Sequence, residues 1–377
     1  MSAKKIYILA GEASGDLHGA NLIRYLRAQS GSPLEIYGVG GDKIRESGVK
    51  DFYDLAHFHV TGLSAAIKKL PEYKRASVAI FSNIEKVRPD LVVLIDNPGF
   101  NLHLAKKIHA LDIPIVYFIA PQVWAWAPKR VLKIKRYVKK VLVVFQFEKG
   151  FFEDHGVDVA WVGHPLKDMV EAEAGGLVEK RSKDKKGHQI ALLPGSRKGE
   201  LKTLLSIFLK AASRIHQAMP EAVFTLIKAP TLPRSVYEER MKDLDFPVKI
   251  VEKNAYAAIH ASDLAVVCSG TATLECAMLG TPMVITNRGS FVTYIAAKSV
   301  IRVKYLGLPN LILNKEAFPE LLQYDCTPEK IAKEALRILQ DDKTAQAMRK
   351  ACEEVSKQVG DTGASKRAAE EVLALLR

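Results

Sequence analysis

One carboxylate of the sequence stands where a general base could act. Asp96 follows the apolar run of residues 91–95 and opens the loop of residues 97–101. A carboxylate at the carboxyl end of a buried parallel strand is partly desolvated, which suits a base that takes a proton from a hydroxyl group such as that of a sugar. The alternative is that Asp96 forms an Asx-turn or caps the helix that begins before Asn101.

A second segment has residue types that suit a nucleotide. The apolar run of residues 264–268 leads into Ser269, Gly270 and Thr271, and Glu275 lies four residues beyond Thr271. At a helix N-terminus the amides of Gly270 and Thr271 could face a phosphate, and Glu275 could accept two ribose hydroxyl hydrogen bonds one turn later. The alternative is a capping box, but that motif places its acid three residues after the Ser or Thr, so it misfits Thr271.

Two further loops follow apolar runs in the same way. Ser196 and Arg197 end the sequence Leu-Pro-Gly-Ser-Arg ahead of an expected helix, and because Arg can hold two phosphate oxygens they suit a diphosphate. The alternative is that Arg197 is an ordinary surface arginine.

The other loop directly follows the first apolar run of the sequence. Its small residues could turn backbone amides toward a polar or anionic ligand, or they could form a tight turn without a ligand. Its residues are Gly11, Glu12, Ala13, Ser14, Gly15 and Asp16.

Motifs for cofactors and metals are missing or incomplete. Gly38 and Gly40 begin a dinucleotide fingerprint, but Lys43 replaces its third glycine, and there is no Walker A or H-E-x-x-H sequence. The acidic residues Asp243 and Asp245 precede an expected strand, so we interpret them as turn residues. We therefore expect no cofactor and no essential metal.

Composition favours a reducing compartment and anionic partners. The net charge of the 377 residues is +13, and seven Lys or Arg fall in residues 129–140 at the spacing of an amphipathic helix. No zinc-finger or aromatic RNA-binding motif accompanies them, so we expect phosphorylated ligands or an anionic membrane and no nucleic acid. The four cysteines form no C-x-x-C pair and no segment is long enough to span a bilayer, so the expected location is the cytoplasm.

The elements that must position these loops alternate between strand-like and helix-like segments. This pattern predicts an α/β protein of two doubly wound, Rossmann-like lobes facing a cleft. We expect the first lobe in residues 1–170, a polar linker in residues 171–188 and the second lobe in residues 189–343. The helical residues 344–377 are expected to pack back on the first lobe.

Several motifs together make the chain resemble the bacterial lipid A disaccharide synthases over essentially its whole length. They are Gly11 to Asp16, Ile95 to Asn101, Pro121 to Trp126, Leu193 to Arg197, Ser269 to Glu275 and Leu308 to Leu311. The resemblance implies a GT-B type, inverting glycosyltransferase that needs no metal. Such an enzyme joins UDP-2,3-diacylglucosamine to 2,3-diacylglucosamine 1-phosphate and releases UDP with the β-1,6 disaccharide 1-phosphate.

The resemblance also implies roles for individual residues. Asp96 matches the family's proposed base, Arg197 its diphosphate arginine, Glu275 its ribose carboxylate and Asn310 a residue near the nucleotide. Many members carry a second acid where this chain has Gly99, which leaves Asp96 as the single candidate base. The alternative is another UDP-sugar enzyme of this architecture, either a peptidoglycan lipid transferase or a UDP-N-acetylglucosamine epimerase.

An apolar stripe in the first lobe suggests how acylated substrates are reached. Leu63, Ile67 and Leu70 recur at helical spacing beside two lysines, ahead of Pro71, where we expect the helix to break. The stripe could face the core. The alternative is an interfacial helix that, with the basic residues 129–140, places the protein on the inner face of the inner membrane.

Overall fold

The chain folds into two α/β units. The structure, a computed structural model, describes residues 3–11, 13–54, 63–174, 187–229, 232–289 and 303–376. The first unit comprises Met1–Pro165 and Val359–Arg377, and the second comprises Leu166–Gln358. Each unit contains one parallel sheet with helices, so the predicted class of two doubly wound α/β lobes is confirmed.

The first unit is built on a seven-stranded sheet in the order β3-β2-β1-β4-β5-β6-β7. The chain order reverses between β1 (Lys4–Ala10) and β4 (Leu91–Ile95), which pair in parallel with Ala10 opposite Ile95. At such a switch point the chain leaves neighbouring strands in opposite directions, which opens a crevice at their carboxyl ends. The loops that begin at Gly11 and Asp96 therefore start next to each other. The other strands are β2 (Leu34–Gly40), β3 (Lys50–Asp54), β5 (Ile115–Phe118), β6 (Lys140–Val143) and β7 (Val159–Trp161).

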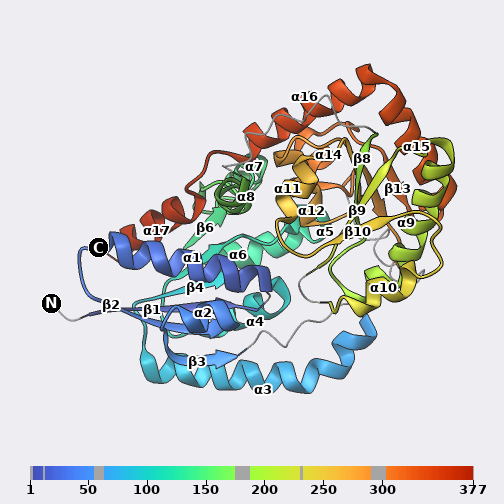
Figure 1. The fold of residues 1–377 in the computed structure, drawn as a ribbon. Helices are drawn as coiled ribbons and strands as arrows, with labels where there is room; N and C mark the ends of the chain where they lie inside the picture. Colours follow the sequence, from blue (N-terminus) through green and yellow to red (C-terminus); the bar gives the residue numbers. More distant parts are fainter. Residues whose placement is uncertain are drawn as a thin grey trace. The chain divides into compact units, whose positions relative to one another are not determined.

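Apolar side chains alternate along β1 between the two faces of this sheet. Tyr7 and Leu9 join the core on one face, and Ile6 and Ile8 join the core on the other. The last helix, α17 (Ala364–Ala374), lies along α1 (Ala13–Gln29) and adds to the second of these cores (Figure 1). The remaining helices of the unit are α2 (Asp42–Glu46), α3 (Leu63–Val87), α4 (Pro98–His109), α5 (Val123–Trp126), η1 (Pro128–Arg130), α6 (Val131–Tyr137) and α7 (Gln146–Asp154).

The second unit repeats this plan with a six-stranded sheet in the order β10-β9-β8-β11-β12-β13. Its chain order reverses between β8 (Gln189–Leu193) and β11 (Leu264–Cys268), which pair in parallel. The loops that begin at Pro194 and Ser269 therefore share the switch point of this sheet. The other strands are β9 (Val223–Ile227), β10 (Val248–Val251), β12 (Met283–Asn287) and β13 (Glu320–Leu322).

Nine helical segments surround the second sheet within the described residues. The longest, α9 (Lys198–Ala218), packs on α15 (Pro328–Gln340). The others are α8 (Leu166–Ala174), α10 (Ser235–Met241), α11 (Ala255–His260), α12 (Thr271–Met278), α14 (Leu308–Leu313), η2 (Gln323–Asp325) and α16 (Asp342–Val359).

Three expectations about the elements differ from the structure. The expected linker of residues 171–188 begins inside α8, and residues 175–186 lie outside the described part of the chain. Of the expected tail of residues 344–377, only the part from Val359 onward belongs to the first unit, because α16 packs with the second. Helix α3 continues through Pro71, since a proline removes one backbone hydrogen bond and the long helix keeps the others.

Candidate active site

Asp96 lies on a strained turn whose backbone is held from two sides. Asp96 and Asn97 have φ angles of 49° and 44°, in the left-handed region of backbone conformation that residues other than glycine rarely adopt. The Asp96 carbonyl accepts hydrogen bonds of 2.7 Å from the Tyr117 hydroxyl and from Asn101 Nδ2, which also donates to the Ile95 carbonyl at 3.1 Å. Strain that is maintained in this way is typical of functional sites, where it fixes the direction of a side chain.

The loop after β1 lies directly against this turn. A Cβ atom on Gly11 would stand 2.1 Å from Asn97 Nδ2, so a larger residue there would displace the Asn97 side chain. Gly15 faces the side chains of Ala10 and Ile95, and Ser14 is exposed. Glu12, which we expected in this loop, lies outside the described residues.

Asp16, the last residue of the same predicted loop, uses its carboxylate within the protein. Its buried carboxylate accepts three backbone N–H groups, from Gly41 at 2.8 Å, Lys43 at 2.9 Å and Ile44 at 3.0 Å. These amides belong to the start of α2, whose N-terminus is thereby satisfied. Asp16 thus fastens α1 to the turn after β2.

A buried carboxyl that the sequence analysis missed lies near the ends of β5 and β6. Glu148 accepts a hydrogen bond from Trp124 Nε1 at 3.0 Å and one from the Phe145 backbone N–H at 3.2 Å. Burial raises the pKa of Glu148 to about 7. The Trp124 ring meets Phe147 edge-on at 5.0 Å between centroids, and Phe147 stacks on Phe145 at 5.5 Å. The only sequence signal was a Glu at the third position of α7.

Two buried histidines were also missed. Desolvation lowers the pKa of His18 on α1 to about 4. It also lowers the pKa of His164, after β7, to about 3, with a smaller contribution from His18. The His164 ring lies 5.3 Å from the Phe145 ring. Both histidines are therefore neutral near pH 7.

In the second unit the turn after β8 carries Ser196 and Arg197, both exposed. Gly195 opens the turn with a φ of 109°, a conformation that favours glycine. Arg197 is the N-cap residue of α9, and its guanidinium pairs with Glu200 Oε1 at 3.0 Å. An arginine beside a helix N-terminus can bind an anion through its side chain and through backbone amides.

The neighbouring turn after β11 opens α12. Gly270 has a φ of 153°, and a Cβ there would meet nothing within 4 Å, so its surroundings are open. Thr271 is exposed, whereas Thr273 is buried and donates its hydroxyl to the Gly270 carbonyl at 2.7 Å. Ser269 donates its hydroxyl to the Leu306 carbonyl at 3.2 Å. The turn therefore leaves room for a ligand in front of the α12 N-terminus.

Glu275 lies one turn inside α12, near Tyr256 and Glu173. Its Oε1 accepts the Tyr256 hydroxyl at 3.3 Å. Burial raises the pKa of Glu275 to about 7, and the charge of Glu173 adds to this shift. Because a desolvated carboxyl gains from further hydrogen-bond donors, this group suits a ligand that brings hydroxyls.

Asn310, which the family resemblance predicts to lie near the nucleotide, has its side chain hydrogen-bonded within the protein. It is fully buried, and its Nδ2 donates to the Phe318 carbonyl at 2.7 Å and to Glu320 Oε1 at 2.8 Å. Its Oδ1 accepts the backbone N–H groups of Ala317 and Phe318, each at 2.9 Å. All of its hydrogen-bonding groups are used within the protein, so Asn310 fastens α14 to the segment before β13.

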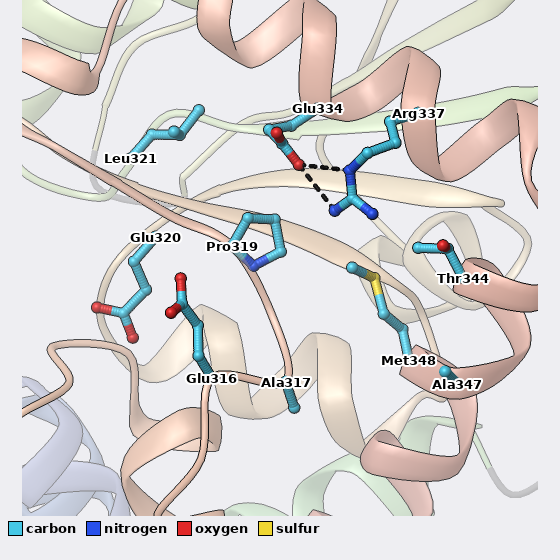
Figure 2. Close-up of a pocket in the computed structure, with 10 residues that line it drawn as sticks. All are labelled: Glu316, Ala317, Pro319, Glu320, Leu321, Glu334, Arg337, Thr344, Ala347 and Met348. Carbon is cyan, nitrogen blue, oxygen red and sulfur yellow. Dashed lines mark hydrogen bonds and ion pairs between the residues drawn. The ribbon is translucent and has the colours of Figure 1, made fainter.

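An open cavity of about 500 Å³ in the second unit is lined by residues of β13, of the segment before it, of α15 and of α16 (Figure 2). Its lining includes Pro319 and Glu320, at the amino end of β13, and an ion pair between Glu334 and Arg337. None of the residues predicted to bind UDP lines this cavity, so it is not the candidate site. No group of three or more metal-ligating side chains occurs among the described residues.

The predicted membrane contacts are described only in part. Leu63, Ile67 and Leu70 fall in the first turns of α3, but their side chains lie outside what the structure describes. In the basic run α6 buries Val131 and Ile134 and leaves Leu132 exposed over 62% of its surface. No helix among the described residues is long and apolar enough to cross a bilayer.

Comparison with known proteins decides the family. The model of the lipid-A-disaccharide synthetase family matches residues 6–374. The chain belongs to the lipid-A-disaccharide synthetase family. It is 38% identical to a lipid-A-disaccharide synthase of Syntrophus aciditrophicus, with 100% of this chain and 99% of the relative covered. It is 36% identical to one of Myxococcus xanthus, with 99% and 97% covered. Members of this family are hexosyltransferases that make the lipid A disaccharide, and that is the activity of this chain.

Solved structures show the same fold at low sequence identity. A putative UDP-N-acetylglucosamine 2-epimerase from Listeria monocytogenes is similar with a TM-score of 0.68 at 14% identity, covering 100% of this chain and 96% of that one. The calicheamicin glycosyltransferase CalG4 has a TM-score of 0.63 at 16% identity, with 100% and 99% covered. At such identities the likeness shows the GT-B fold alone, so it does not favour an epimerase over a family synthase.

Proposed function

We propose that the protein transfers the acylated glucosamine of UDP-2,3-diacylglucosamine to 2,3-diacylglucosamine 1-phosphate. The bond between the anomeric carbon and the diphosphate breaks, and a bond from that carbon to the acceptor's 6-hydroxyl oxygen forms with inversion. The products are the β-1,6 disaccharide 1-phosphate and UDP. The observation that carries this proposal is the match of the family over residues 6–374.

In the proposed reaction Asp96 takes the proton of the acceptor hydroxyl. Its position supports the role, because it follows a central strand at the switch point of the first sheet and its backbone is fixed in a strained turn. Gly11 contacts this turn, and the exposed Ser14 follows it at the start of α1; this loop would contact the acceptor.

The second unit would bind UDP at its own switch point. Ser196 and Arg197 after β8, together with Ser269, Gly270 and Thr271 after β11, would hold the diphosphate. Arg197 and the α12 N-terminus would also stabilise the negative charge that develops on the departing diphosphate. Electrostatic stabilisation of developing charge is usually a large contribution to enzyme catalysis. Glu275 would accept the ribose hydroxyls, which supply the donors that its desolvated carboxyl lacks.

The acylated substrates require access to a bilayer. We propose that the first unit binds an anionic membrane surface on its cytoplasmic side, through exposed basic residues of α6 and its flanks and through Leu132. Lys133, Lys135, Arg136 and Lys139 are all exposed there.

Product analysis tests the proposal directly. The purified protein is incubated with both acylated substrates in detergent micelles, and the products are identified by mass spectrometry and by the coupling of the anomeric proton. We expect one disaccharide phosphate with a β linkage and one UDP per turnover. Release of UDP without disaccharide, or epimerised UDP-sugar in the absence of acceptor, would contradict the proposed reaction.

A further inference from the structure

Glu200 folds back over the turn that carries Ser196 and Arg197. Its Oε2 accepts the backbone N–H of Ser196 at 3.1 Å and that of Arg197 at 3.2 Å. Its Oε1 accepts Arg197 Nη1 at 3.0 Å. One carboxylate thus occupies the N-cap amide of α9, the amide before it and the guanidinium at once.

These are the groups that a diphosphate would use. Consecutive amides at a helix N-terminus and an arginine beside them form a site for an anion, and a carboxylate satisfies it in the way that a phosphate does. Gly195 also fits this interpretation, because a Cβ there would come within 2.5 Å of Glu200 Oε2. The glycine therefore leaves space in front of the turn for the carboxylate.

We propose that Glu200 is an internal substitute for the diphosphate, which occupies its subsite in the free protein and is displaced when the nucleotide binds. This inference rests on the proposed UDP site. When UDP leaves after the transfer, Glu200 returns to the amides and the guanidinium. Its charge thus weakens UDP binding and favours product release.

Glu200 is free of close packing on one side, and its charge reaches the second turn of the proposed UDP site. The Glu200 side chain is 25% exposed, so it can turn toward solvent without a change in the backbone. Burial raises the pKa of the Cys268 thiol, the charge of Glu200 raises it further, and that of Arg197 lowers it. Both charges therefore act at the end of β11, where the turn of Ser269 to Thr271 begins.

The variant Glu200→Gln separates the two roles. Glutamine can still accept an amide hydrogen bond in a capping box, but it carries no charge against a phosphate. We expect UDP to bind about 3- to 10-fold more tightly to Glu200→Gln than to the wild type, a small effect because the carboxylate is partly solvated. Uridine, which has no phosphate, should bind both proteins equally. Titration calorimetry with both ligands measures this.

A matched control removes a similar charge elsewhere in the second unit. Glu238 on α10 forms an exposed ion pair with Arg234 at 2.6 Å, and Glu238→Gln changes the net charge by the same amount. It should leave the affinities for UDP and uridine unchanged. Equal tightening in both variants would overturn the proposal, since the cause would then be net charge.

Weaker or unchanged UDP binding in Glu200→Gln would also overturn it and would make Glu200 a cap or a positioning partner of Arg197. A wild-type protein that binds no UDP would instead contradict the proposed function. If Glu200→Gln fails to fold, a crystal structure of the wild type with UDP decides. The Glu200 carboxylate should then lie beyond hydrogen-bond distance of the Ser196 and Arg197 amides, and its retention there would refute displacement.

Discussion

At the scale of single residues, the structure separates groups that can reach a ligand from groups that hold the protein together. Asp96 and Arg197 lie on turns at the switch points of their sheets, and Arg197 is exposed. Asp16, which stands in an equally distinctive motif, uses its carboxylate on backbone amides, and Asn310 uses its amide on backbone groups and on the Glu320 side chain. A motif therefore marks a region, and the hydrogen-bond partners decide which of its residues are available for chemistry.

Asp96→Asn tests the base. The amide keeps the shape of the side chain but cannot take a proton, so we expect kcat to fall by about 10²-fold or more. The dissociation constant of UDP should stay the same, because UDP is proposed to bind to the other unit. Asp154→Asn, an exposed change on α7, is the control and should keep full activity. Near-normal turnover in Asp96→Asn would show that Asp96 is not the base.

Glu275→Ala tests the ribose contact. The loss of hydrogen bonds to a charged group should weaken UDP and UMP by a similar factor, about 10-fold or more, because both contain the ribose. A diphosphate whose ribose lacks the 2′ and 3′ hydroxyls should bind the variant and the wild type alike. Tyr256→Phe, which removes the neighbouring hydroxyl and keeps the carboxylate, should have a smaller effect. An unchanged UDP affinity in Glu275→Ala would leave this carboxyl a structural group.

At the scale of elements, the central strands were predictable, whereas two of the four edge strands were not. The runs that form β4 and β11 are apolar throughout, and those of β1 and β8 are largely apolar after their polar first residues, because central parallel strands are covered on both faces. The edge strands β3 and β13 were missed: β3 reads Lys-Asp-Phe-Tyr-Asp and has no buried residue. An edge strand is defined by its neighbour, which local sequence does not reveal.

The candidate site shows the same division. Turns that follow central strands could be located from sequence, since the turn after a parallel strand ends at the ligand-binding edge. The contacts of Glu148 with Trp124 and of Glu200 with Arg197 could not be predicted from sequence, because they depend on the directions of the side chains. Helix α14 illustrates the consequence, because its Asn310 resembles a ligand residue in sequence and is a structural one in the fold.

Asn310→Ala tests that structural role at the junction of α14 and β13. The substitution leaves the buried backbone amides of Ala317 and Phe318 without a hydrogen-bond acceptor. This loss should lower the free energy of unfolding by about 2–4 kcal/mol. Urea unfolding followed by circular dichroism measures the loss. The UDP affinity of the folded variant should be close to that of the wild type. A large loss of UDP binding with normal stability would show instead that Asn310 acts on the ligand.

At the scale of the whole molecule, buried ionisable groups make stability depend on pH in both directions. The pKa of Glu148 is raised from 4.5 to about 7, so the folded protein holds a proton that the unfolded chain releases between these values. Stability is therefore lost as the pH rises through this window. His18 and His164 have pKa values lowered from 6.5 to about 4 and about 3, so their contribution is lost as the pH falls below 6.5.

Glu148→Gln should remove the alkaline part of this dependence in the first unit. Glutamine resembles the protonated carboxyl, so the free energy of unfolding of the variant's first unit should not fall between pH 5 and pH 8. The wild type should lose up to about 3 kcal/mol of this free energy over the same range. All three tryptophans, Trp124, Trp126 and Trp161, belong to the first unit, so tryptophan fluorescence follows its unfolding alone. Parallel pH profiles for the two proteins would show that Glu148 is ionised in the fold at neutral pH.

The distribution of charge over the molecule bears on how it meets its lipid substrates. Helix α6 buries Val131 and Ile134, so the apolar positions of the basic run serve the core and its cations point to solvent. Leu132 stands among these cations with 62% of its surface exposed, and an exposed leucine beside lysines suits the boundary between headgroups and acyl chains. Basic residues each contribute about 1 kcal/mol near an anionic surface.

Leu132→Ser tests whether this face meets the membrane. The side chain is exposed, so the variant should fold normally, while its binding to anionic vesicles should fall about 3- to 10-fold because a leucine no longer enters the interface. Val236→Ser, at an exposed apolar position of the second unit, should not change vesicle binding. Raising the salt concentration should weaken binding of the wild type only in part, because the apolar contribution is not screened. If Leu132→Ser binds as well as the wild type and moderate salt releases both completely, the attachment is electrostatic, and cations alone bring the first unit to the bilayer.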